Sequence, residues 1–387
     1  MTALRYLVCI LVLNGSTLAL RALTDPNYSC DPKAMAPSAS VPTNVNQVRF
    51  ADIKVIAALG DSLTAANGAG APHEDPLAII LQYRGLSFHA GGQYSLEEQI
   101  TVPNILKKFN PKLEGYAIGT GSENVWEVAK LNGGIPGSKS LAGEGQNLKT
   151  EAQWMINKIK SHPEIDIEND WKLINIFIGG NDICEWCIDP NTIDTVSAAG
   201  YAQGIADAAE LIRQYLPRTI ISVMSMFNMD NLRSIDNGQF FCQGMHVFEC
   251  HCEANNVSNA LLANISAQYQ VAAMGLQTSG KFEHDDFSLV VQPWFQDVRN
   301  PPYTPTGEVD HLWFAPDCFH FSAWGHSVVA HHLWNNMVEP VGKKSTYGNL
   351  TLTEAHLKCP DTACPYFRTT KNSQDCSQYW TPSTLDI

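Results

Sequence analysis

Apolar residues recur along the chain in two spacings that alternate from one end to the other. Runs of consecutive apolar residues, typical of strands buried on both faces, occupy residues 54–59, 173–178, 219–227 and 287–293. Apolar residues at intervals of three and four predict helices at residues 96–109, 147–160, 198–217 and 257–274, and another that starts near residue 326. This alternation predicts an α/β fold, a three-layer αβα sandwich around a central, mostly parallel sheet.

The domain organisation follows from the same pattern. A chain of 387 residues that is 44% hydrophobic can bury one large core. We predict a single domain over residues 51–340, because no internal repeat of fixed period and no second core-forming unit is evident. Residues 20–50, rich in Pro, Ala and Ser, predict an extended lead-in, and residues 341–387 predict a disulfide-linked C-terminal extension that packs on the same domain.

The N-terminal residues predict export. Arg5 precedes an apolar stretch over residues 6–13 and then small residues, as in a secretory signal peptide, which we place at residues 1–19. The C-terminal end is polar and predicts neither a membrane span nor a lipid anchor. We therefore expect a secreted, extracellular protein. Its net charge of -14 disfavours nucleic acid as a partner.

Cysteines and glycosylation sequons agree with that compartment. An even number of cysteines follows the predicted signal peptide, and in a secreted chain this predicts up to five disulfides whose pairing the sequence leaves open. The candidates are Cys30, Cys184, Cys187, Cys242, Cys250, Cys252, Cys318, Cys359, Cys364 and Cys376. The sequons predict glycosylation acceptors at Asn27, Asn256, Asn264 and Asn349.

Ser62 stands where the first predicted strand ends. The run "VIAALGDSLT" passes from a buried strand into Gly60, which permits a sharp turn, and then into residue types that begin helices. Two interpretations fit Ser62: a helix N-cap hydroxyl, or a nucleophile presented at the carboxyl edge of the sheet.

Two further segments carry candidate chemistry. Asn181 follows the second strand in "GGND", as a turn residue or as an amide donor for an oxyanion. Asp317 and His320 are three residues apart in "PDCFHF". This spacing lets a carboxylate orient an imidazole that acts as a general base. Alternatively, Asp317 caps a turn and His320 packs among the neighbouring aromatic residues.

The three segments together resemble a known family. "GDSLT" at 60–64, "GGND" at 179–182 and "DCFHFSAWGH" at 317–326 are similar to sequence blocks of the GDSL or SGNH hydrolases, and most similar to the animal phospholipase B branch. The resemblance spans most of the chain and implies the flavodoxin-like fold of that family. It also implies roles: Ser62 as nucleophile, His320 as base, Asp317 as its orienting partner, and an oxyanion hole of Ser62, Gly137 and Asn181.

The resemblance implies the reaction as well. We expect a serine esterase that forms an acyl-enzyme without metal or cofactor and removes acyl chains from glycerophospholipids and lysophospholipids. Triglycerides, retinyl esters or acetylated sugars are alternative substrates, and contact with a lipid surface would be transient. Aromatic residues near His320 suit an acyl chain, although they could equally be core residues: Trp313, Phe314, Phe319, Phe321 and Trp324.

Two other classes of protein compete with the esterase. One is a lipid-binding protein that has kept the fold and lost catalysis, but here all four chemical groups are present. The other is a metalloprotein built on clusters such as "ECHCE" at residues 249–253. In a secreted chain, however, Cys250 and Cys252 favour disulfides over a metal site.

Overall fold

The computed structural model describes residues 21–142, 146–187, 193–236, 240–255 and 257–387. The predicted signal peptide and the sequon at Asn256 lie outside these residues. Asn27, Asn264 and Asn349, the other predicted glycosylation acceptors, are exposed.

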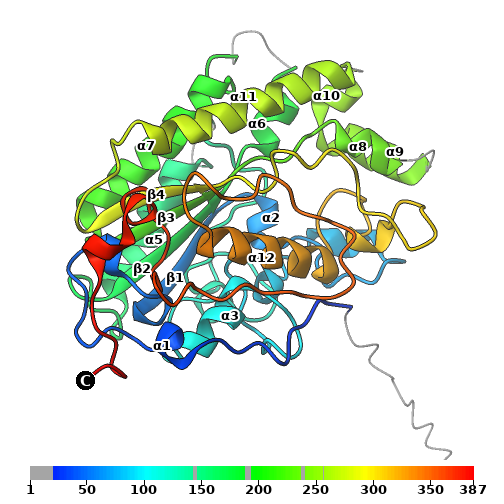
Figure 1. Ribbon diagram of the computed structural model, residues 1–387. Helices are drawn as coiled ribbons and strands as arrows, with labels where there is room; N and C mark the ends of the chain where they lie inside the picture. Colours follow the sequence, from blue (N-terminus) through cyan, green and yellow to red (C-terminus); the bar gives the residue numbers. More distant parts are fainter. Residues whose placement is uncertain (1–20, 143–145, 188–192, 237–239, 256) are drawn as a thin grey trace, which may run out of the picture.

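A parallel sheet forms the centre of the molecule (Figure 1). Its strands β1 (Ile53–Gly60), β2 (Trp171–Phe177), β3 (Thr219–Met224) and β4 (Phe287–Gln292) are hydrogen-bonded in sequential order. Nearly every strand residue is buried, which explains why the strands read as continuous apolar runs.

The free edge of β1 is extended by two short parallel bridges. Val55 pairs with Glu114, and Ala58 pairs with Asn132. After β1 the chain therefore runs first to one side of that strand and then returns to form β2 on its other side. Such a change of direction creates a crevice at the carboxyl end of the central strand, where α/β proteins place their functional sites.

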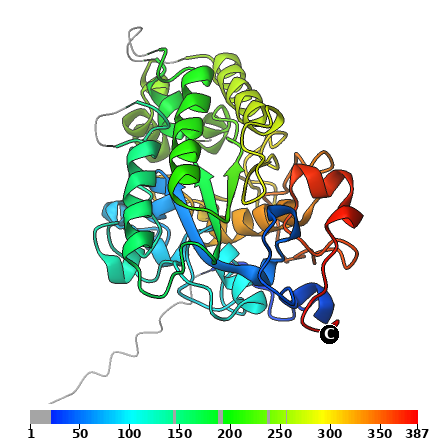
Figure 2. The same cartoon turned by 90° about the vertical axis from the view of Figure 1, so that its left-hand side faces the viewer.

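Helices cover both faces of the sheet (Figures 1 and 2). The connections between successive strands run through α5 (Leu148–Ser161), α7 (Ala198–Tyr215) and α11 (Asn259–Thr278). Right-handed crossovers in a sheet of sequential order place all three on one face. The opposite face is covered by α3 (Val102–Phe109) and α12 (Ala323–Val338). The predicted three-layer arrangement is confirmed.

The remaining helices are short. They are α1 (Pro32–Met35), α2 (Ser62–Ala65), α4 (Trp126–Ala129), α6 (Gly180–Glu185), α8 (Asn231–Asp236), α9 (Phe240–Glu249), α10 (His251–Ala254) and α13 (Thr370–Gln374). Of these, α8 and α9 pack together at the rim of the molecule (Figure 1). No helix in the described part of the chain has both the length and the apolar character that crossing a membrane requires.

Several predicted boundaries were wrong: the helix expected to start near residue 326 begins at Ala323, and the helix expected to end at residue 274 ends at Thr278. The helix expected at 96–109 begins only at Val102, because the Thr101 hydroxyl caps it by accepting a hydrogen bond from the Asn104 amide at 3.1 Å. The strand expected at 219–227 ends at Met224, where pairing with β4 stops. Periodicity locates an element better than it locates its ends.

The two ends of the described chain lie against each other. A disulfide joins Cys30 to Cys359, and Arg49 forms an antiparallel bridge with Tyr366. The lead-in expected to be extended also contains α1. A second disulfide, between Cys364 and Cys376, closes a loop within the C-terminal residues.

Candidate functional site: a hydrogen-bonded serine, histidine and aspartate

Ser62 lies at the carboxyl end of β1, in the first turn of α2. Gly60 makes the turn with a φ of +149°, and a Cβ atom there would lie 2.0 Å from the Phe177 carbonyl oxygen, so only glycine fits. Asp61, not Ser62, is the N-cap of α2, since its carboxylate accepts a hydrogen bond from the Leu63 amide at 2.9 Å. The N-cap interpretation of Ser62 was therefore wrong.

The Ser62 hydroxyl lies against a histidine from far along the chain. Its Oγ is 2.7 Å from His320 Nε2, and His320 Nδ1 is 2.6 Å from Asp317 Oδ2. All three side chains are buried. If Nδ1–H donates to Asp317, Nε2 is left to accept the serine proton, as a general base requires.

The loop of residues 314–321, which we call the histidine loop, fixes this geometry. Its ends pair through an antiparallel bridge between Phe314 and Phe321. Asp317 Oδ1 accepts hydrogen bonds from the backbone amides of Phe319 and His320, both at 3.0 Å. Asp317 therefore caps the turn and accepts a hydrogen bond from the imidazole at once.

Asn181 lies in the first turn of α6, which follows β2. Its Nδ2 donates a hydrogen bond to the Ser138 carbonyl oxygen at 3.0 Å, which brings it beside the segment that contains Gly137. An amide nitrogen carries two hydrogens, so a second donor remains for a ligand. Gly137 has a φ of +80°, a left-handed conformation that favours glycine, although a Cβ atom there would meet nothing within 4 Å.

Two buried carboxyl groups hold this segment against the strand ends. Glu151 of α5 accepts hydrogen bonds from the Gly60 amide at 2.7 Å and from the Ser138 hydroxyl. Asp182 of α6 accepts from the backbone amide of Ser140 at 3.1 Å and from its hydroxyl at 2.5 Å. Burial raises the pKa of Asp182 to about 6 and raises that of Glu151 well above its usual value. Neither residue was predicted from the sequence: Asp182 closes the "GGND" segment, in which only Asn181 was given a role, and Glu151 stands in no recognisable motif.

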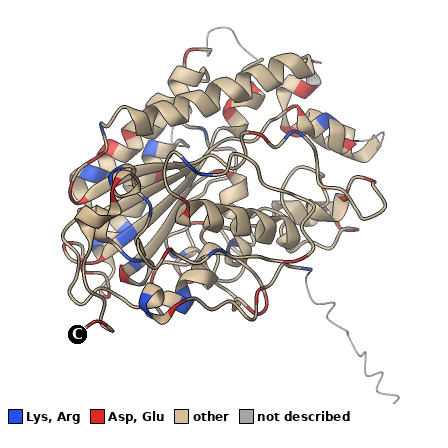
Figure 3. Ribbon diagram, viewed as in Figure 1, with Lys and Arg blue, Asp and Glu red and all other residues tan. Residues whose placement is uncertain are grey.

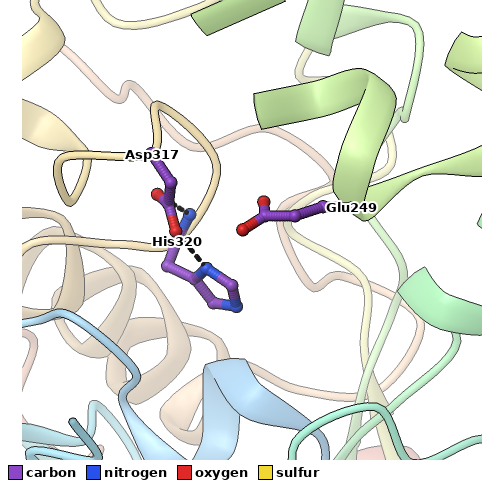
Figure 4. A group of neighbouring side chains, drawn as sticks. All are labelled: Glu249, Asp317 and His320. Carbon is purple, nitrogen blue, oxygen red and sulfur yellow. Dashed lines mark hydrogen bonds and ion pairs between the residues drawn. The ribbon is translucent and has the colours of Figure 1, made fainter. Parts of the chain in front are cut away.

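A further carboxyl group faces the histidine from α9 (Figure 4). Oxygen atoms of Glu249 and Asp317 and a ring nitrogen of His320 all lie within 4.8 Å of one another. Burial raises the pKa of Glu249 to about 7, with the charge of Asp317 adding to the effect. In the sequence Glu249 stands in the "ECHCE" segment, where no local pattern indicates that it lies beside His320.

The charges around His320 act in one direction. Burial disfavours the imidazolium, but the carboxylate of Asp317, helped by Glu249, outweighs burial and raises the pKa of His320 above its usual range. Burial also disfavours the charged form of Asp317, yet His320 and two backbone amides hold its pKa below its usual range. The site thus stabilises a protonated histidine beside an ionised aspartate, the charge pair that forms when a serine loses its proton.

Disulfides decide against the metal interpretation of the "ECHCE" segment. Cys250 pairs with Cys184, and Cys252 pairs with Cys187, so none of these sulfurs is a thiolate. The neighbouring Cys242 pairs with Cys318 of the histidine loop. Glu249, Asp317 and His320 are close enough to share an ion, but both ring nitrogens of His320 are already engaged by Asp317 and Ser62.

An apolar pocket opens beside the histidine loop. Its cavity volume is about 40 Å³, and its walls include Trp313, Phe314, Phe319 and Phe321 of the five aromatic residues predicted to contact an acyl chain. Trp324 does not line it and instead packs under the Arg21 guanidinium, 4.2 Å from the ring centre. Its lining also includes Phe227, Leu232, Ile235, Phe295 and Val298.

Comparison with known proteins agrees with these features. The sequence profile of the family described as GDSL-like Lipase/Acylhydrolase matches residues 56–333. Proteins named "Phospholipase B1, membrane-associated" are similar over most of the chain: that of Homo sapiens is 37% identical over 353 residues, 89% of this chain. That of Rattus norvegicus is 38% identical over 353 residues, and that of Mus musculus 37% over 362 residues.

The likeness covers only part of those proteins. The matched region amounts to 24% of the human and mouse proteins and 23% of the rat protein. The chain therefore spans about a quarter of the length of the curated relatives it matches.

Proposed function

The chain belongs to the family of GDSL-like lipases and acylhydrolases, and from this premise we propose that it is a serine esterase acting on glycerophospholipids and lysophospholipids. One observation carries the proposal: Ser62 Oγ lies 2.7 Å from a histidine nitrogen whose partner nitrogen is 2.6 Å from a buried aspartate. A serine with a base and an orienting carboxylate is the arrangement that activates a hydroxyl for attack on an ester.

The reaction proceeds in two steps through an acyl-enzyme. His320 takes the proton of Ser62 as Oγ attacks the ester carbonyl carbon, and then gives that proton to the departing alcohol. Water enters, His320 takes its proton, and attack on the acyl-enzyme releases the fatty acid and restores Ser62. Asp317 stays ionised throughout and stabilises the imidazolium.

The oxyanion that forms in each step needs donors near Ser62. We assign these to the backbone amides of Ser62 and Gly137 and to the Asn181 side chain. Asn181 has a second amide hydrogen available, because only one is directed to Ser138. Each such donor contributes about 3 kcal/mol to lowering the barrier, so Asn181→Ala should reduce kcat about 100-fold or more.

The apolar lining of this pocket, rather than its volume, supports an acyl chain as the group transferred. Its wall includes Phe319 and Phe321, the sequence neighbours of His320, so a chain bound there would leave its ester close to the reacting groups. Leu232→Trp, in the pocket lining, should fill the pocket. We expect it to lower kcat/KM about tenfold for a long-chain ester while an acetyl or butyryl ester is hydrolysed as before.

The proposal is tested with purified protein and a panel of phospholipids, lysophospholipids, triglycerides and acetylated sugars. We expect release of fatty acid from the first two classes, and its loss in Ser62→Ala. A fluorophosphonate should label Ser62 in the wild-type protein. Absence of labelling in a folded protein would contradict the esterase and leave a lipid-binding protein on the same fold. Hydrolysis of acetylated sugars alone would contradict the lipid substrate.

We also propose that the protein is secreted. Five disulfides support this, since such bonds form and persist in oxidising compartments. Expression of the full chain in a secretory cell should place the protein in the medium, with the N-terminus near residue 20. Retention in the cytosol with free thiols would contradict it.

A further inference from the structure

Helix α9 has two faces of opposite character. The face turned toward the protein carries buried or partly buried residues, Cys242, His246 and Glu249. The outer face carries apolar side chains that lie within about a third of a turn of one another at 100° per residue. They are Phe240 (89% exposed), Phe241 (46%), Val247 (48%) and Phe248 (81%).

This outer face is unusual for a protein surface. Single exposed apolar side chains are common, but here four lie on one helical face, three of them phenylalanine, and make an apolar patch. The helix contains no Lys, Arg or Asp, and its one acidic residue, Glu249, points inward (Figures 3 and 4). An apolar patch without charge is expected to be covered by something in the functional state.

The patch lies close to the proposed catalytic residues. Glu249, the last residue of α9, faces His320, and the disulfide from Cys242 to Cys318 ties the helix to the histidine loop. The neighbouring α8 contributes Leu232 and Ile235 to the wall of the apolar pocket. Whatever covers the outer face of α9 therefore binds to a helix that is tied to the histidine loop and packed on α8.

We infer that the outer face of α9, formed by Phe240, Phe241, Val247 and Phe248, docks the protein on a neutral or zwitterionic phospholipid surface. The inference rests on the proposed function, because a phospholipid is the substrate that comes as an extended surface. Aromatic side chains on one face of a helix insert into the boundary between headgroups and acyl chains, and their affinity grows with the apolar area buried.

Charge selects the kind of surface. Interfacial helices that bind anionic lipids carry Lys and Arg on their polar face. Here α9 has neither, and the whole chain carries a net charge of -14. An anionic membrane would repel the protein, whereas a phosphatidylcholine surface presents no net charge. The structure thus favours zwitterionic over anionic lipid, and a hydrophobic over an electrostatic attachment.

The test measures binding separately from catalysis. In a Ser62→Ala background, which prevents hydrolysis, the full chain is sedimented with vesicles of phosphatidylcholine or phosphatidylglycerol. We expect stronger binding to phosphatidylcholine, and a loss of about tenfold or more in Phe240→Ser/Phe248→Ser. The matched control is Val271→Ser/Trp380→Ser, which removes apolar side chains that are 71% and 63% exposed elsewhere and should change nothing.

Activity gives a second readout. With Ser62 restored, Phe240→Ser/Phe248→Ser should lose hydrolysis of vesicle lipid and keep kcat/KM on a dissolved short-chain ester. Equal vesicle binding by this variant and the wild-type protein would overturn the inference, as would preference for phosphatidylglycerol. Conversion of a dimer to a monomer by the variant, with vesicle binding unchanged, would assign the face to a second copy instead. Vesicle binding is measured without hydrolysis. It therefore tests the docking surface even if the protein proves not to be an esterase.

Discussion

The two sides of the site are built in different ways. On one side, Ser62 and Asn181 stand at the ends of β1 and β2, where the buried carboxyl groups of Glu151 and Asp182 accept hydrogen bonds from the neighbouring Gly60 and Ser140 amides. On the other side, α9 is joined to the histidine loop by the disulfide from Cys242 to Cys318.

The difference reflects how much core each side shares. The strand ends belong to the central sheet and inherit its rigidity. In contrast, α9 buries few of its apolar residues and turns its phenylalanines outward, so burial alone contributes little to its position. A covalent link supplies what packing does not. A region held this way can expose an apolar face and still keep Glu249 near His320.

Asp317 and Glu249, the two carboxyl groups near His320, lie on the second of these sides. Of all the changes considered, Asp317→Asn should reduce activity most. Asp317 accepts hydrogen bonds from two backbone amides and from the imidazole, and these bonds stabilise its negative charge. An amide would favour the wrong histidine tautomer, and we expect kcat to fall about 10⁴-fold with little change in fold. Steady-state kinetics and circular dichroism measure the two quantities. A loss below tenfold would show that Asp317 is only a turn residue.

Removing the disulfide in Cys242→Ser/Cys318→Ser should affect stability and activity together. The disulfide joins two residues that are 76 positions apart in the sequence. Its loss should lower the free energy of unfolding by about 4 kcal/mol, because the unfolded chain gains conformational entropy. Activity should fall as well, because α9 and the histidine loop become independent. Urea unfolding and ester hydrolysis are the measurements.

The matched control for that variant is Cys364→Ser/Cys376→Ser, whose bond spans 12 residues in the C-terminal extension. We expect a loss of about 3 kcal/mol there with normal kcat in the folded protein. Equal loss of activity in both variants would mean that the Cys242–Cys318 bond has no specific effect on the site.

Substitutions at Glu151 test the side of the site that is held at the strand ends. Burial raises the pKa of Glu151, and its carboxyl group accepts hydrogen bonds from the Gly60 amide and the Ser138 hydroxyl. Glu151→Gln keeps an acceptor for the Gly60 amide and offers an amide donor to the Ser138 oxygen, so it should be nearly neutral. Glu151→Ala leaves the Gly60 amide unpaired and should cost about 2 kcal/mol of stability, with a lower kcat. Equal unfolding curves for the two variants would contradict this role.

The smallest expected effect is a shift in pH dependence from Glu249→Gln. The groups that face His320 are Asp317, Glu249 and Asp61, and His246 lies near Glu249. The Glu249 carboxylate favours the imidazolium, so its removal should lower the pKa of His320. Since the base must be neutral, the acid limb of kcat/KM should move to lower pH, by about one unit.

The matched control for Glu249→Gln is Glu253→Gln, which removes a carboxylate of α10 that is 2.6 Å from Arg233 and does not face His320. Its pH profile should equal that of the wild-type protein. If Glu249→Gln lowers the rate equally at every pH, Glu249 has a packing role only.

Most of the fold and the centre of the site could be read from the sequence. Runs of apolar residues located the strands, because a strand buried on both faces needs no polar position. Ser62, Asn181, Asp317 and His320 were found because each stands in a short motif with a polar group after an apolar run or beside a second titratable residue. The helix start at Val102 was missed, since it depends on which hydroxyl caps it.

The tertiary structure alone decided what faces these residues. The sequence determined an α/β chain with a serine, an asparagine and an Asp-x-x-His pair, since strand burial and motif spacing are local properties. It could not determine that Glu249 lies beside His320, that Cys242 pairs with Cys318, or that α9 turns three phenylalanines outward. Those facts depend on contacts between segments about 70 residues apart, and no local pattern encodes which distant segment a helix will meet.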